Sequence, residues 1–229
     1  MNRCEDYVAH YETDGNEFDY FSNEDRHASA FDVLFRKFVV KLAGEQKEVV
    51  DIGSGGGWTT VIPHERMIFM DLSRKNLQNL VSDEASAVLS DAHRLSLKDE
   101  SVSFVIASEI FEHLNDPETA AAEVLRVLKP GGTAVITTPY KEKIRYTLCI
   151  HCNKLTPWNS HLHSFDSDKL SALFAGGRKR TYLLGSKLFA IMRIYPILNK
   201  LPLGVWRALD WTANKLLDRA AYLVLVIEK

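Results

Sequence analysis

A short apolar run that leads into an acid and a glycine-rich turn constrains this chain more than any other feature. Residues 49–57 read Val-Val-Asp-Ile-Gly-Ser-Gly-Gly-Gly, so Asp51 is followed by Gly53, Gly55 and Gly57. Glycine has no Cβ and adopts positive φ at low steric cost, so such a turn lets bare main chain approach a ligand. The pattern predicts a β-strand that ends at a ligand-binding turn.

The spacing of the glycines separates the classes of ligand. A dinucleotide-binding turn needs a third glycine or an alanine three positions after the second, and Trp58 occupies that position. Asp51 would repel a phosphate but attract an amino group, and no Gly-Lys-Ser/Thr sequence of a Walker turn follows. S-adenosylmethionine has an amino group and no phosphate, so it fits this turn best.

From this turn onward the sequence resembles the class I S-adenosylmethionine-dependent methyltransferases of the small-molecule type. The first motif of that family is an acid-x-Gly-x-Gly-x-Gly turn after the first strand, as at residues 51–57. Asp71, at the end of the apolar run 67–70, matches the acid that follows the family's second strand. The family's other motifs are matched in the same order along the chain. The adenine-binding turn corresponds to residues 90–92, and the fourth strand and the active-site loop after it correspond to residues 103–108 and 109–113. The turn before the fifth strand corresponds to residues 129–132.

The resemblance implies which residues bind the cofactor. Asp51 would face the ammonium group of the methionine end, Asp71 would accept the ribose hydroxyls, and Asp91 would accept the adenine amino group. Asp71 and Asp91 could instead be surface carboxylates that cap the following helices. The full implied set is Asp51, Gly53, Ser54, Gly55, Asp71, Leu72, Asp91, Ala92 and Ser108.

Strand-like and helix-like runs alternate along the chain, which is typical of an α/β protein with a parallel sheet. The resemblance implies a Rossmann-like seven-stranded sheet, mostly parallel, with an antiparallel last strand beside the sixth and helices on both faces. The expected strands are 48–52, 67–70, 87–90, 102–107, 133–138, 180–184 and 221–227. The expected helices are 28–43, a short one after the glycine turn, one from the cap Asp116 to Leu128, and one from the cap Asp166 to Ala175.

The length of 229 residues fits a single methyltransferase domain over 1–229. We expect an N-terminal arm and helix at 1–45, an irregular Cys/His segment at 140–165 and a helical insertion at 186–219 that acts as a lid. Aromatic residues of the arm either line a pocket or pack on the helix that follows. In the second half of the insertion, an apolar stripe should face the protein, with Trp211 on the polar side; its expected members are Val205, Trp206, Leu209, Ala213, Leu216 and Leu217.

The amino-acid composition limits the classes of binding partner that we expect for this protein. A net charge of −2, with 46% hydrophobic and 25% charged residues, is typical of a soluble globular protein and gives no overall attraction to nucleic acid. The first residues lack the apolar core of a signal peptide, and no run approaches the ~18 apolar residues that span a bilayer. We therefore expect a cytoplasmic protein. Three cysteines do not suggest a disulfide scaffold.

Two histidines are candidate catalytic residues, His113 after the fourth strand and His161 ahead of the sixth. Imidazole titrates near neutral pH, so either could orient an acceptor or take its proton. Cys149, Cys152, His161 and His163 could also form a tetrahedral zinc site. The alternatives are a redox-active or metal-free thiol pair, or simple loop packing with His161 in the acceptor pocket.

The predicted function is methyl transfer from S-adenosylmethionine to a small-molecule or lipid- or sugar-linked acceptor by in-line displacement. The alternatives are a catalytically silent cofactor-binding scaffold and a protein or RNA methyltransferase. No Asn-Pro-Pro-Tyr-type motif follows the fourth strand, which argues against amide or base methylation. The apolar and basic segment 186–219 also suggests peripheral membrane contact.

Overall fold

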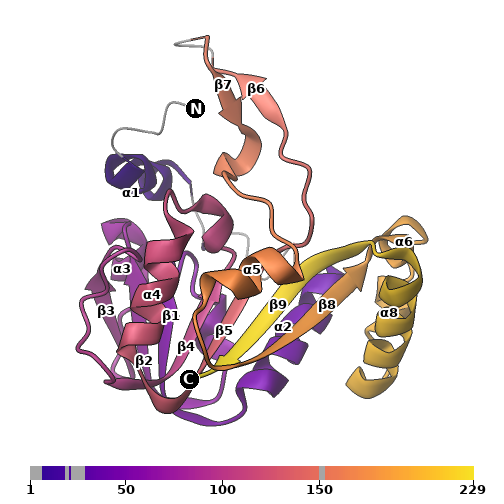
Figure 1. The fold of residues 1–229 in the computed structure, drawn as a ribbon, viewed down its shortest axis with the longest axis horizontal. Helices are drawn as coiled ribbons and strands as arrows, with labels where there is room; N and C mark the ends of the chain where they lie inside the picture. Colours follow the sequence, from indigo (N-terminus) through magenta and orange to yellow (C-terminus); the bar gives the residue numbers. More distant parts are fainter. Residues whose placement is uncertain (1–6, 19–20, 22–28, 150–152) are drawn as a thin grey trace.

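A seven-stranded sheet forms the centre of the protein (Figure 1). The structure is a computed structural model that describes residues 7–18, 21, 29–149 and 153–229. The strand order is β3-β2-β1-β4-β5-β9-β8. The strands are β1 (Gln46–Ile52), β2 (His64–Asp71), β3 (Ala85–Leu89), β4 (Val102–Ser108), β5 (Leu128–Pro139), β8 (Arg178–Ser186) and β9 (Ala220–Glu228).

The direction of the strands confirms the expected fold class. The pairs β1–β2, β1–β4, β2–β3 and β4–β5 are parallel, whereas β9 is antiparallel to both of its neighbours, β5 and β8. This is the Rossmann-like, mostly parallel sheet that the resemblance implies. β5 begins at Leu128 rather than at Thr133, with a register shift opposite 102–104, so the expected turn at 129–132 lies within the strand.

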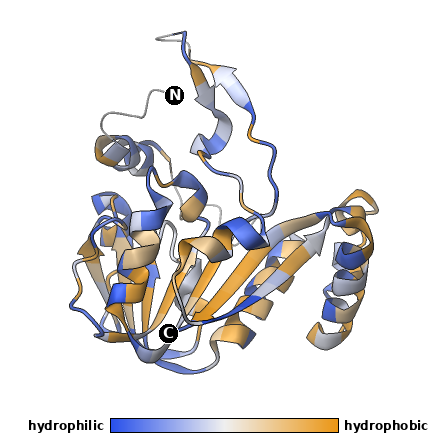
Figure 2. Cartoon of the chain, viewed as in Figure 1, coloured by the Kyte–Doolittle hydropathy of each residue, from blue (hydrophilic) through white to orange (hydrophobic). Residues whose placement is uncertain are grey.

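Helices cover both faces of the sheet, as expected. Side chains alternate between the faces along each strand, so that Val105 and Ala107 of β4 enter one core and Phe104 and Ile106 enter the other. The first core also contains α4 (Pro117–Val127) and α5 (Ser167–Leu173). The second contains residues of α2 (Ala30–Ala43), α3 (Arg74–Leu80), α7 (Tyr195–Leu198) and α8 (Leu203–Leu217). Figure 2 shows the hydrophobic strands between these layers.

The helix starts follow the capping signals of the sequence. Asp116 caps α4 by accepting from the main-chain N–H of Thr119, and Asp166 caps α5 by accepting from that of Lys169. Ser29 and Asp32 form a capping box at the start of α2. After the glycine turn there is only a short 3-10 helix, η1 (Trp58–Val61), before β2.

The segment 140–165 is more regular than expected. It contains an antiparallel hairpin of β6 (Tyr146–Leu148) and β7 (Leu155–Pro157), which projects from the body of the protein (Figure 1), and the 3-10 helix η3 (Trp158–Ser160). The strands of this hairpin are short and largely exposed, so they lack the hydrophobic alternation by which a strand is recognised in a sequence.

The insertion 186–219 is helical as expected, but its predicted apolar stripe is partly wrong. It forms α6 (Lys187–Ile191), α7 and α8. On α8, Trp206, Asp210, Ala213 and Asn214 are buried, whereas Val205, Leu209, Leu216 and Leu217 are exposed. The buried Asp210 accepts hydrogen bonds from the main-chain N–H groups of residues 185 and 186, at 3.1 and 2.8 Å, and this orients the helix.

Candidate cofactor and acceptor site

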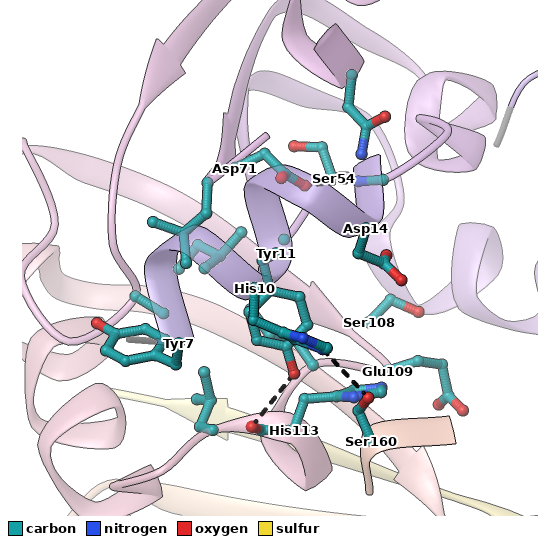
Figure 3. Close-up of a pocket in the computed structure, with 18 of the residues that line it drawn as sticks. Tyr7, His10, Tyr11, Asp14, Ser54, Asp71, Ser108, Glu109, His113 and Ser160 are labelled. Carbon is teal, nitrogen blue, oxygen red and sulfur yellow. Dashed lines mark hydrogen bonds between the residues drawn. The ribbon is translucent and has the colours of Figure 1, made fainter. Parts of the chain in front are cut away.

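A cleft of about 880 Å³ opens at the carboxyl ends of β1, β2 and β4, where ligands bind in open α/β sheets. Its size is in the range of small-molecule sites, about 300–1,000 Å³. Helix α1 (Tyr7–Glu17) lies over the cleft, and Tyr7, His10, Tyr11 and Asp14 line it (Figure 3). The arm is therefore part of the wall of the cleft. Of the two placements expected for its aromatic residues, Tyr7 and Tyr11 have the first, because they line a pocket.

The glycine turn forms the floor of one end of the cleft. Gly53 has φ +70°, and a Cβ built there would come within 2.5 Å of the Ile110 side chain. Gly55 has φ +48° and borders the cleft, and a Cβ there would meet no protein atom within 4 Å. Ser54 is buried and its hydroxyl bonds the main chain of Asp51 and Met70, which fixes the turn on the first two strands. The turn thus leaves room where a ligand would lie.

Asp71 lies beside this turn at the end of β2, and the adjacent Leu72 also lines the cleft. Its carboxylate accepts from the main-chain N–H of Gly55 at 2.9 Å and from that of Ser73 at 2.7 Å. Burial raises the pKa of Asp71, and these hydrogen bonds partly oppose the rise. Each carboxylate oxygen has further acceptor capacity, so Asp71 can hold the turn and still accept from a ligand's hydroxyls.

Asp91 and Ala92 follow β3 and line the same cleft. The Asp91 carboxylate accepts from the Tyr7 hydroxyl of α1 and from the main-chain N–H of His93 at 2.9 Å. Burial alone would raise the pKa of Asp91, but the bonds from Tyr7 and His93 hold it below its usual value. The arm therefore contacts the residue to which the resemblance assigns the adenine amino group.

Asp51 is 2% exposed and lies at the end of β1 on the wall of the cleft. One of its carboxylate oxygens accepts from the Thr59 hydroxyl of η1 at 2.5 Å. The short 3-10 helix after the turn therefore orients this carboxylate. Asp51, Asp71 and Asp91 come from three adjacent strands and converge on one cavity.

The other end of the cleft is formed by the loop after β4 and the segment 158–161. Ser108 bonds the Thr137 hydroxyl at 2.9 Å, and Thr137 in turn donates to Glu109 at 2.9 Å. Glu109 has φ +56°, a conformation that costs energy for a residue with a Cβ and is enriched at functional sites. Burial, followed by the charge of Glu112, raises the pKa of Glu109 well above its usual value.

His113 and His161 meet at this end. Their ring centroids are 4.6 Å apart and nearly perpendicular. Burial, and then the nearby His161, lowers the pKa of His113 to about 4. The buried carboxylate of Glu112 joins them, and burial raises its pKa as well. The two histidines expected at the active site thus lie together, although 48 positions separate them in the sequence.

The expected zinc ligands are not brought together in the described part of the chain. Cys149 lies at the hairpin between β6 and β7, where its N–H bonds the Lys154 carbonyl at 3.0 Å. Cys152 lies outside the described residues. His163 contacts the Leu114 carbonyl at 2.8 Å instead. The one grouping of three potential ligands among the described residues is Glu112, His113 and His161.

No individual role was predicted for Glu112, although it lies in the expected active-site loop 109–113, and Glu142 was not predicted as part of the site. Glu112 carried a signal, because it directly precedes His113 in the loop after the fourth strand. Glu142 bonds Nδ1 of His161. No sequence signal indicated this contact, because Glu142 follows the end of β5 outside any motif.

Comparison with known proteins agrees with this geometry. Residues 50–136 match the family model described as a methyltransferase domain. The match covers the end of β1, the glycine turn, β2, β3 and β4, and it ends within β5. The matched region contains Asp51, Asp71 and Asp91. Residues 50–136 are therefore similar to a methyltransferase domain, which agrees with the resemblance to the class I S-adenosylmethionine-dependent methyltransferases.

Individual relatives are similar over part of their length. The chain is 30% identical over 128 residues to the ubiquinone/menaquinone biosynthesis C-methyltransferase UbiE of Desulfotalea psychrophila, covering 50% of this chain and 52% of the relative. It is 32% identical over 126 residues to the malonyl-[acyl-carrier protein] O-methyltransferase of Marinomonas sp., covering 50% of this chain and 46% of the relative. The matches span only 30% to 52% of the curated relatives' lengths.

The fold is shared over nearly the whole chain with a solved structure. This is a chain from the complex between the Haloferax volcanii Trm112 methyltransferase activator and a methyltransferase, with a TM-score of 0.61 and 21% identity. The similarity covers 99% of this chain and 97% of that one. At this level of identity the likeness concerns the fold alone.

Proposed function

We propose that this chain transfers a methyl group from S-adenosylmethionine to a small-molecule or lipid- or sugar-linked acceptor. The observation that carries the proposal is the convergence of Asp51, Asp71 and Asp91 around a glycine turn whose open side faces the cleft. Asp14 of α1 also lines the cleft and adds to the rise that burial causes in the pKa of Asp71, and no lysine or arginine of the described residues lines it. This excess of acids suits a cationic nucleoside without phosphates.

In this proposal each of the three acids at the strand ends has its own partner on the cofactor. Asp51 pairs with the ammonium group, Asp71 accepts the ribose hydroxyls and Asp91 accepts the adenine amino group. Gly53, Ser54, Gly55, Leu72 and Ala92 form the surface against which the nucleoside packs. S-adenosylmethionine supplies a methyl carbon on a positively charged sulfur, and this carbon bonds to the acceptor's lone pair as the carbon–sulfur pair passes to sulfur.

The chain's own contribution to the chemistry is position and exclusion of water. Helix α1 and residues 158–161 enclose the acceptor end, where Ser108, His113 and His161 face the cavity. A neutral imidazole can take the acceptor's proton, and the lowered pKa of His113 keeps its ring neutral at physiological pH. We propose His113 and His161 as the residues that orient or deprotonate the acceptor.

The names of the relatives support a small or carrier-linked acceptor, since one is named for quinone biosynthesis and one for a malonyl group on a carrier protein. The experiment is to incubate the protein with methyl-labelled cofactor and a fractionated extract and to trace the label. Label in a low-molecular-weight or lipid fraction is expected. Label only in protein or RNA would support the alternative acceptors, and no label with cofactor bound would support a silent scaffold.

A second proposal concerns the insertion, which we suggest contacts an anionic lipid surface. Ile191, Ile197 and Leu216 are 75%, 64% and 78% exposed. Residues 186–219 contain six basic residues and two acids, and both acids are paired, Asp210 with Arg207 and Asp218 with Lys141. Apolar side chains beside unopposed positive charge are typical of interfacial helices. No described helix is long and apolar enough to cross a bilayer.

Replacing Ile191, Leu209 and Leu216 together by serine is expected to weaken binding to anionic vesicles by about 10-fold or more, because buried apolar area is lost. Co-sedimentation with phosphatidylglycerol vesicles measures this. Val81→Ser, at an exposed valine after α3, is the control and should bind as the wild type does. Equal sedimentation of the triple variant and the wild type would remove the proposal. Trp206 is unsuitable for this test because it is fully buried.

A further inference from the structure

We propose that Glu112, His113 and His161 form a binding site for a divalent transition-metal ion at the acceptor end of the cleft. This inference rests on the proposed function, because it assigns a role to the same cleft. One ligand atom of each residue lies within 4.8 Å of the others. Two imidazoles and one carboxylate are a donor set that binds zinc, iron or manganese while leaving coordination positions open.

The buried carboxylate of Glu112 is the strongest sign of a missing partner. The residue is 1% exposed, and neither of its carboxylate oxygens makes a hydrogen bond of normal geometry to the described residues. The nearby Thr138 hydroxyl opposes the rise that burial causes in the pKa of Glu112, but it is itself without a well-formed hydrogen bond in the described part of the chain. Nδ1 of His113 is also buried and without a partner within that part of the chain. Burying a carboxylate without a partner is costly, so such groups are normally paired or coordinate metals. A cation between Glu112 and the two imidazoles would remove this cost.

His161 is held in place for ligation by contacts on both sides. Its Nδ1 bonds the carboxylate of Glu142, an arrangement that orients histidine ligands and leaves Nε2 available. The main-chain N–H groups of Leu162 and His163 donate to the Glu112 carbonyl at 2.7 and 3.1 Å. These bonds fix the segment after η3 against the loop after β4. The second histidine is therefore positioned before any ion binds.

The placement of the three residues indicates what the ion would do. His113 and His161 line the cleft, as Figure 3 shows for His113, whereas Glu112 lies behind them in the wall. An ion held by all three would direct its open positions toward the cleft. Acceptors that present an oxygen, such as a hydroxyl or phenol, are the class that would occupy such a position. Of the two roles proposed above for the histidines, this arrangement selects the first, because they would orient the acceptor through the ion rather than take its proton.

Cobalt provides the direct test, because its visible spectrum reports the ligands. The full-length protein is stripped with a chelator and titrated with Co²⁺, and Zn²⁺ then competes for the site. The wild type is expected to bind one ion stoichiometrically. The isosteric variant Glu112→Gln and the variant His161→Gln should each bind at least about 100-fold more weakly. No stoichiometric binding by the wild type would overturn the proposal.

Two matched controls separate this site from the cysteine site considered above. His163→Gln changes a histidine two positions away, and Cys149→Ser removes one of the thiols. Both should bind cobalt as the wild type does. Loss of binding in these controls, with Glu112→Gln unaffected, would contradict the assignment and favour the cysteines.

Thermal unfolding gives a second readout that does not depend on activity. Without metal, Glu112→Gln should be at least as stable as the wild type, because a neutral amide of the same shape replaces an unpartnered buried carboxyl group. With metal, the Tm of the wild type should rise and that of the variant should not. A Tm increase of equal size in both would contradict the site. Titration of the same variants with S-adenosylmethionine keeps the two proposals distinct, since metal-site changes should leave cofactor affinity within about threefold of the wild type.

Discussion

Replacing Gly55 by leucine is expected to reduce the affinity for S-adenosylmethionine by about 100-fold or more while leaving the protein folded. Gly55 has φ +48°, and a Cβ at this position would meet no protein atom within 4 Å. The side chain would therefore extend into the cleft, into the volume that we assign to the cofactor. The strain of the left-handed conformation costs about 1–2 kcal/mol, which a folded domain tolerates.

Gly176 offers a matched control for this substitution. It has φ +73°, a Cβ there would also meet nothing within 4 Å, and it lies in the turn between α5 and β8, away from the cleft. Gly176→Leu should lose a similar amount of stability and keep full cofactor affinity. Calorimetric titration measures the cofactor affinity of both variants, and denaturant unfolding measures their stability. Wild-type affinity in Gly55→Leu would show that the cofactor does not lie against this turn.

Replacing Asp71 by alanine is expected to weaken cofactor binding by about 10- to 150-fold, because two charge-assisted hydrogen bonds are worth about 1.5–3 kcal/mol. Part of the loss will come from the turn itself, since Asp71 also accepts from the N–H groups of Gly55 and Ser73. Equilibrium titration with S-adenosylmethionine and with adenine alone measures the effect. The substitution should weaken the binding of adenine, which lacks the ribose, much less than it weakens the binding of the cofactor.

The control for Asp71→Ala is Ser73→Ala. Ser73 caps α3 by accepting from the N–H of Asn76, and it does not line the cleft. This variant disturbs the same segment and costs about 1 kcal/mol of stability, yet it removes no proposed cofactor contact. Cofactor affinity should therefore stay near that of the wild type. Equal losses in the two variants would mean that Asp71 acts through the local structure rather than on the ribose.

The sheet and the cofactor end of the cleft could be predicted from the sequence because their signals are local. A strand, an acid and a glycine turn follow one another within a few residues, and the parallel topology then brings the ends of β1, β2 and β3 to one edge. The caps at Asp116 and Asp166 are similarly local. For these elements each residue's own preference agrees with the fold around it.

The acceptor end could be predicted only in part, because its contacts are long-range. Nothing in the sequence indicates that the N–H groups of Leu162 and His163 donate to the carbonyl of Glu112. Those bonds are what bring His161 to His113. The inner face of α8 was missed for a related reason: Asp210 is polar, yet it is buried because it accepts from the main chain at the end of β8.

Calorimetric titration of the purified protein with S-adenosylmethionine, and in parallel with NAD, tests the central claim most directly. The acids of the cleft should bind the sulfonium nucleoside stoichiometrically, with an affinity about 100-fold or more above that for the dinucleotide, because a pyrophosphate beside Asp51 and Asp71 is repelled. Folded protein that bound NAD more tightly, or bound neither compound, would contradict the account.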